Sequence, residues 1–224
     1  MFLCYHSIGT ELSDYAWRTA PEAFAQHLKI LGDLFDILAL DDAMERLTAN
    51  DSGLRPAAVI TFDDGFRDNL TRATPILETA NMPATLFAPR DLIRRGGATH
   101  MTEHELIELS HHKLWSLGAH GVTHNMLPGF VPADQRRELK ESRDWLSDLT
   151  GIRPRAVAYP QGAICPSSVA LARNNYEWGC STDRRLRTGF DPLQVRRFCP
   201  TYAEDDPAAF LRALLTTPAE DGRN

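Results

Sequence analysis

The sequence predicts an α/β fold built on a parallel sheet, either open or closed into a barrel. Short β-rich runs alternate with helical patterns along the chain, which is the order that parallel βαβ units produce. The length of 224 residues suits one sizeable domain and needs no second core. In either form of the sheet, functional groups gather at the carboxyl ends of the strands.

The first half of the chain predicts three strands and three helices in alternation. The strands are short apolar runs, at residues 2–6, 35–40 and 57–62. The helices carry apolar residues at helical spacing, at residues 21–31, 41–49 and 69–80. Pro21 suits the first turn of one helix, and Asp41 could cap the next.

The second half continues the same alternation. Further strands are expected at residues 84–88, 114–119 and 155–159. One helix is opened by Thr102, and Glu105 three positions later completes a capping box. A long charged helix over residues 133–151 ends at Gly151. We therefore expect one domain over residues 1–217 and a flexible tail over residues 218–224.

Composition excludes several classes of function. The formal charge of −6 is spread along the chain without a Lys/Arg-rich block, which argues against a nucleic-acid groove or a polybasic membrane patch. The opening "MFLCYHSIG" lacks the features of a signal peptide, and no transmembrane-length apolar run occurs. We expect a cytoplasmic protein. The four cysteines form no CxxC pair and predict neither a disulfide framework nor a zinc knuckle.

Two carboxylates, Asp63 and Asp64, follow the strand "AAVITF" directly, and Gly65 follows them. Like charges at close range shift each other's pKa, so the pair needs an explanation. An Asp-Gly turn is one interpretation. A functional interpretation requires matching groups at other strand ends.

Two histidines provide such groups. The strand before them ends at Ala119, and His120 and His124 follow with flanking glycines. Two imidazoles four positions apart, together with one carboxylate, form a His/His/Asp set with open positions for water. The pattern predicts a hydrolytic divalent-metal site.

The spacing HxxxH occurs a second time, in His100 and His104, which serves as an internal control. This pair lies on either side of the helix start at Thr102 and does not follow a strand. Because functional groups of a parallel sheet gather after strands, we do not expect this pair to bind metal.

A third strand end reads "AVAYPQG". It forms a loop whose backbone N–H groups could point into a cleft, and an ordinary turn is the alternative. The loop residues are Tyr159, Pro160, Gln161 and Gly162.

Taken together, "TFDDG" at residues 61–65, "HGVTH" at 120–124 and the opening "YHSI" before "APEAFAQHLKIL" resemble the polysaccharide deacetylase family, the NodB-homology carbohydrate esterases. The resemblance covers roughly residues 2–200. It implies a distorted (β/α) barrel with fewer than eight regular repeats. It also implies that Asp63 is the catalytic base, and that Asp64, His120 and His124 bind the metal.

The sequence departs from the family pattern at two places. Ala158 stands where the family has an arginine that steadies the base, and Gln161 stands where it has an aromatic residue. The replacement charge could come from Arg153, Arg155 or Arg197. No histidine follows His124, so the family's final histidine has no counterpart. His6, after the first strand, is the candidate general acid, with a structural histidine as the alternative.

The resulting hypothesis is a metal-dependent hydrolase, with Zn²⁺ as the expected ion, that removes the acetyl group from an N-acetylated sugar or glycoconjugate. Protein partners and oligomeric state are not predicted. Two alternatives stay open at this point. One is a hydrolase of another linear or cyclic amide. The other is a catalytically inactive, metal-containing carbohydrate-binding protein.

Overall fold

The computed structural model describes residues 1–12, 14–49, 55–183 and 190–217. Its centre is a parallel sheet in the order β1-β5-β6-β7-β8-β9-β10, with β4 pairing on β5. The strands of this sheet are β1 (Phe2–Tyr5), β4 (Asp36–Ile37), β5 (Ala57–Phe62), β6 (Ala84–Ala88), β7 (Trp115–Ala119), β8 (Ala156–Ala158), β9 (Trp178–Ser181) and β10 (Val195–Arg196). A separate two-stranded ribbon joins β2 (Ser7–Ile8) to β3 (Arg18–Thr19).

The sheet curves into a nearly closed barrel. Beyond β10, Phe198 forms a parallel bridge to Leu3 of β1, so the last strand returns to the first. The N–H of Cys4 donates to the Phe198 carbonyl, and the N–H of Phe198 donates to the Phe2 carbonyl. The α/β barrel implied by the resemblance is therefore confirmed.

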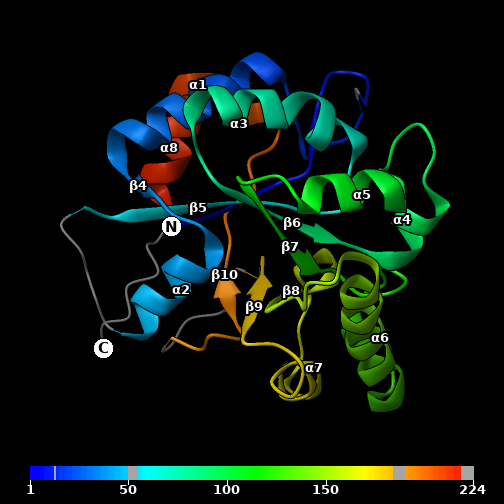
Figure 1. The fold of residues 1–224 in the computed structure, drawn as a ribbon. Helices are drawn as coiled ribbons and strands as arrows, with labels where there is room; N and C mark the ends of the chain where they lie inside the picture. Colours follow the sequence, from blue (N-terminus) through cyan, green and yellow to red (C-terminus); the bar gives the residue numbers. More distant parts are fainter. Residues whose placement is uncertain (13, 50–54, 184–189, 218–224) are drawn as a thin grey trace.

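Helices surround the strands (Figure 1). In this view α1, α3 and α8 lie on one side of β5, and α2 lies on the other. The helices are α1 (Pro21–Leu34), α2 (Leu40–Thr48), α3 (Thr74–Ala80), α4 (Arg90–Arg95), α5 (Glu103–Ser110), α6 (Pro132–Thr150), α7 (Pro166–Ala172) and α8 (Pro207–Thr216). Within the described residues, none of the helices has both the length and the apolar character needed to span a bilayer.

Several local predictions are confirmed. Pro21 opens α1, and Thr102 and Glu105 exchange both hydrogen bonds of the capping box. Gly151 ends α6 with φ +72°, a left-handed conformation that favours glycine. The predicted helix at 69–80 begins as a π-helical turn over Asn69–Ala73 before α3. The expected tail at 218–224 lies outside the described residues.

Two local predictions are wrong. The strand expected at 35–40 is limited to β4, because Leu40 is the first residue of α2 and its side chain is buried in the core. Asp41 does not cap α2, whose N-cap residue is Ala39. The Asp41 carboxylate instead accepts a hydrogen bond from Trp178 Nε1 at 2.8 Å. Tertiary contacts thus override the local signal.

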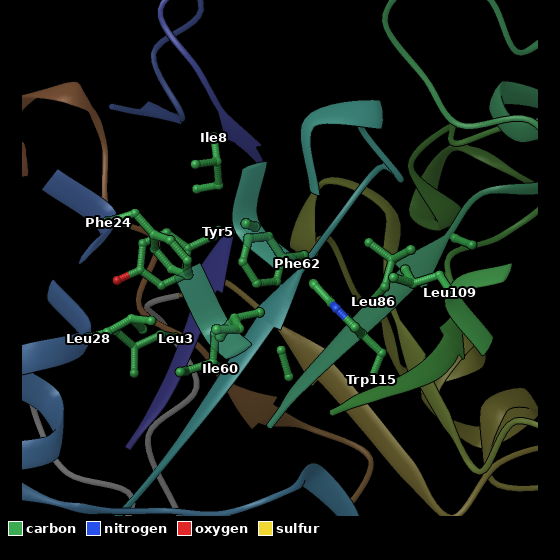
Figure 2. Close-up of a cluster of buried hydrophobic side chains, with 14 of the residues drawn as sticks. Leu3, Tyr5, Ile8, Phe24, Leu28, Ile60, Phe62, Leu86, Leu109 and Trp115 are labelled. Carbon is green, nitrogen blue, oxygen red and sulfur yellow. The ribbon is translucent and has the colours of Figure 1, made fainter. Parts of the chain in front are cut away.

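A large apolar cluster packs β1, β5, β6 and β7 against the surrounding helices (Figure 2). Tyr5, Phe24 and Phe62 meet there, with ring centroids 5.0 to 5.7 Å apart. Burial of such aromatic side chains contributes about 2–3 kcal/mol each. This packing fixes β1 and β5, whose carboxyl ends carry His6 and the Asp pair.

Candidate active site

Asp63 and Asp64 follow β5 in a sharp turn and are both buried. Asp64 has φ +70°, an unusual backbone conformation for a residue with a side chain, and Gly65 has φ +67°. A Cβ at Gly65 would lie 2.6 Å from Ile93 Cδ1, so glycine is required there by both space and conformation. The turn brings both carboxylates near one histidine ring, because His120 Nε2 lies 3.8 Å from Asp63 Oδ2 and 3.4 Å from Asp64 Oδ1.

His120 directly follows β7 and is buried. Its Nδ1 lies 2.8 Å from the Ala158 carbonyl oxygen, and because a carbonyl only accepts, Nδ1 carries the proton. Its Nε2 lies 3.4 Å from Asp64 Oδ1. This arrangement, in which one ring nitrogen is held by a carbonyl and the other is free, is typical of metal-binding histidines.

His124 completes the cluster. Its Nε2 lies 2.9 Å from Asp64 Oδ1, and its backbone φ of +64° is again in the left-handed region. Positive φ values at two site residues, Asp64 and His124, are the kind of local strain that gathers at functional sites. Potential ligand atoms of Asp64, His120 and His124 all lie within 4.8 Å of one another.

The donor set fits a divalent metal ion. Because His120 Nδ1 is protonated, a neutral His120 presents the lone pair of Nε2 to Asp64 Oδ1, which is itself buried without a hydrogen-bond donor. Two electron-rich atoms facing each other need a cation between them, either a proton or a metal. Two imidazole nitrogens and one carboxylate oxygen form the ligand set of many catalytic zinc sites. The structure thus supports a candidate metal site at Asp64, His120 and His124, with the identity of the ion left open.

A buried carboxylate on α6 holds the loop between the two histidines. Glu138 Oε2 accepts hydrogen bonds from the N–H groups of Val122 and Thr123, at 2.7 and 3.0 Å. Its Oε1 accepts from the Thr123 hydroxyl at 3.0 Å. The side chain is fully buried. No motif in the sequence pointed to Glu138, although an acidic residue on the inner face of a helix is a signal that could have identified it.

Asp63 is held by Arg197, which comes from the segment after β10. The two guanidinium nitrogens donate to the two carboxylate oxygens, each at 2.7 Å. Arg197 also donates to the Thr61 hydroxyl at 3.0 Å and lies 5.2 Å from the ring centre of Phe87. Burial alone would raise the pKa of Asp63, but the charge and hydrogen bonds of Arg197, together with His120 and His6, outweigh burial and hold this pKa at about 2. Asp63 is therefore ionised throughout the neutral range.

Of the three arginines considered as substitutes for the charge missing at Ala158, Arg197 is the one at the site. Arg155 precedes β8, at the opposite end of that strand, and pairs with Glu177 at 2.7 Å and Glu45 at 3.0 Å. Arg153 lies two positions further from the strand.

His6 and Cys4 also lie beside Asp63. Potential ligand atoms of Cys4, His6 and Asp63 also lie within 4.8 Å of one another, and the Cys4 thiol donates to Asp63 Oδ2 at 3.3 Å. His6 Nδ1 is buried without a hydrogen-bond partner. Burial lowers the pKa of His6 despite the nearby Asp63 charge. His6 is thus placed beside the predicted base, and because Arg197 already contacts both Asp63 oxygens, this second group is poorly suited to bind a cation.

The loop after β8 lies against the histidine loop. A Cβ at Gly121 would lie 3.0 Å from Pro160 Cγ. Tyr159 points into the core, where its hydroxyl donates to the Leu193 carbonyl at 2.9 Å. The N–H groups of Tyr159 and Gly162 already donate to the carbonyls of Cys180 and Tyr159. Gln161 is exposed at φ +56°, and its N–H is the remaining candidate donor of this loop.

The first histidine pair takes no part in the candidate metal cluster. His100 stacks on Phe66, with ring centroids 5.0 Å apart, and His104 lies exposed on α5.

Tyr15, which the sequence did not suggest, contacts the site, and its hydroxyl donates to Asp64 Oδ2 at 3.4 Å. No local pattern in the loop before β3 indicates this contact.

Comparison with known proteins agrees with this geometry. Residues 51–176 match the family model described as "Polysaccharide deacetylase", and the chain belongs to this family. It is 30% identical over 183 residues to the Bacillus subtilis (strain 168) protein called "Putative polysaccharide deacetylase YxkH", which covers 81% of this chain and 63% of that protein. The chain thus spans less than two thirds of this curated relative.

Solved structures share the fold. The Streptococcus pyogenes deacetylase PplD in complex with acetate superposes with a TM-score of 0.81 at 25% identity, over 95% of this chain and 96% of that one. IcaB from Ammonifex degensii superposes with a TM-score of 0.80 at 20% identity, over 94% and 95% of the two chains. The family match and these superpositions together place the chain in the polysaccharide deacetylase family with the fold of that family.

Proposed function

We propose that this protein is a metal-dependent hydrolase that removes the acetyl group from an N-acetylated sugar or glycoconjugate and releases acetate. The proposal rests on the different partners of two adjacent carboxylates in the turn after β5. Asp64 faces His120 and His124, whereas its neighbour Asp63 is held ionised by Arg197. The acetate bound to the related deacetylase PplD supports acetate as the product.

The ligands would be Asp64, His120 and His124. A divalent ion held there, which we propose to be Zn²⁺, would supply Lewis-acid chemistry by polarising a carbonyl and lowering the pKa of water. Ala158 fixes the ring orientation and proton position of His120 through its carbonyl oxygen. Glu138 fixes the loop that carries both histidines.

Asp63 acts as the general base in this proposal. It takes a proton from the attacking water, and Arg197 prevents its carboxylate from rotating away. The N–H of Gln161 is the candidate donor to the oxygen that gains negative charge as the carbonyl is attacked.

The leaving amine must gain a proton when the C–N bond breaks. Once protonated, Asp63 readily returns the proton, because Arg197 and the two neighbouring histidines, His120 and His6, outweigh burial and hold its pKa at about 2. His6 lies close enough to be the alternative donor, but burial lowers its pKa and favours the neutral ring. We therefore favour Asp63 as both base and acid, with His6 as the second candidate.

Acetate release from oligomers of N-acetylglucosamine tests the proposal. Protein stripped with a chelator should be inactive, and added Zn²⁺ should restore release in the wild type but not in Asp64→Ala. Saturable sugar binding without any acetate would favour the carbohydrate-binding alternative. Release of acid from a non-sugar amide alone would favour the other amidohydrolase. The cytoplasmic location stays a prediction from the sequence.

A further inference from the structure

We infer that Trp17 is a sugar-binding residue, on whose exposed indole ring a pyranose of the substrate stacks while the acetyl group lies at the metal centre. The inference rests on the proposed function for the class of ligand. Its evidence is separate, because it comes from a loop that contributes none of the metal ligands.

A continuous series of contacting aromatic rings connects the candidate metal site to Trp17. Tyr15 contacts Asp64 through its hydroxyl, and its ring centroid lies 5.9 Å from that of Trp17. The Trp17 ring also lies 6.1 Å from the ring of His6, which is beside Asp63. Phe66 packs against Tyr15, with ring centroids 5.5 Å apart. Trp17 is therefore only one side chain away from both carboxylates of the site.

Trp17 differs from the other tryptophans of the chain in its exposure. Its exposed fraction is 45%, whereas those of Trp115, Trp145 and Trp178 are 6%, 6% and 7%. Burial of this exposed aromatic ring against a bound ligand would therefore be favourable. The C–H face of a pyranose is apolar and its edges are polar, which matches an indole with an apolar face and a polar N–H.

The segment that carries Trp17 is fixed in place. The next two residues form β3, which pairs with β2. The Ala16 carbonyl accepts a hydrogen bond from the N–H of Tyr202 at 3.1 Å, and Arg18 lies over the Tyr202 ring at 5.6 Å. Binding on this surface therefore costs little conformational ordering.

A binding measurement tests the inference without turnover. In the Asp63→Asn variant, iodide should quench mainly the exposed Trp17, and oligomers of N-acetylglucosamine should reduce that quenching in a saturable way. In Asp63→Asn/Trp17→Ala the iodide-sensitive fluorescence should be absent. Quenching of Trp17 that stays unchanged up to the solubility limit of the sugar would overturn the inference.

Kinetics provide the second test. Trp17→Ala should raise KM for the oligomer by about 3- to 10-fold, which corresponds to about 0.6–1.4 kcal/mol of binding free energy. The kcat and the metal content should stay near those of the wild type, and Trp17→Phe should recover most of the affinity. Ile152→Ala, at an exposed apolar residue near the amino end of β8, is the matched control and should change neither constant.

The two hypotheses fail in different ways. An active wild type whose KM does not respond to Trp17→Ala would overturn the stacking role and leave the deacetylase function intact. Sugar protection of Trp17 in a protein that releases no acetate would support the stacking role and contradict the proposed reaction.

Discussion

Arg197 contacts both carboxylate oxygens of Asp63 at 2.7 Å, although 134 positions separate the two residues. Both side chains are buried, so each charge depends on the other for compensation. The pair also brings the last strand segment of the barrel to the turn after β5. The orientation of the predicted base thus depends on closure of the barrel.

Removing the guanidinium should destabilise the fold. Arg197→Met leaves the buried Asp63 charge without its guanidinium partner, and we expect a loss of about 3–5 kcal/mol in the free energy of unfolding. Urea denaturation measures it. The double variant Asp63→Asn/Arg197→Met should recover much of the loss, because it removes the uncompensated charge. A double variant as unstable as the single one would show that the pair is not the source of the effect.

The two histidine pairs should respond differently to substitution. His120→Ala removes a ligand placed 3.4 Å from Asp64 Oδ1 and should leave the site empty of metal. His100→Ala removes a ring stacked on Phe66, outside the cluster, and should leave about one equivalent bound. Elemental analysis of both purified variants decides the assignment, and the reverse pattern would refute it.

Glu138 should influence metal affinity without touching the metal. In Glu138→Gln the negative charge and one accepting oxygen are removed, so the charge-assisted hydrogen bonds to the histidine loop are weakened. We expect metal affinity to fall by about 10- to 100-fold, as for other groups that orient metal ligands. Equilibrium dialysis with Zn²⁺ measures it. Glu141→Gln on the same helix is the matched control, because that carboxylate is solvent-exposed and pairs with Arg90. Equal affinity in the two variants would count against the positioning role.

His27 should make stability depend on pH. It is fully buried, stacks on Phe210 at 3.7 Å, and its Nε2 donates to the Glu204 carbonyl. Burial lowers its pKa to about 4, below the value of about 6.5 in an unfolded chain. Between these two values the unfolded state binds more protons, so stability decreases as the pH falls from 6.5 to 4.

The size of this effect follows from linkage. At pH 5 the penalty is about 2 kcal/mol relative to pH 7. The contribution of His27 is isolated by comparing urea midpoints of the wild type and His27→Gln at both pH values. The variant should lose less stability on acidification. Identical pH dependence in the two proteins would show that His27 does not titrate in this range.

Sequence patterns correctly predicted those structural features that depend on residues close together in the chain. The capping box at Thr102 and the glycine end of α6 were predictable, because each involves only residues a few positions apart. The prediction that Asp41 caps α2 was wrong, and the carboxylate instead accepts a hydrogen bond from Trp178, which is distant in the sequence. At the site, the two short motifs fall at strand ends and could be found. Arg197 could only be proposed among three arginines, since its choice depends on how the barrel closes.

The most direct test of the account is the metal content of two variants of neighbouring residues. Asp64→Ala removes one of three protein ligands, so both metal and acetate release should be lost. Asp63→Asn keeps all three ligands, so metal should stay bound while the rate falls by about 10²–10⁴ for loss of a general base. A turn-forming role alone predicts modest losses of thermal stability in both variants and no selective effect on metal. If Asp63→Asn loses its metal as readily as Asp64→Ala, the division of roles between the two carboxylates is contradicted.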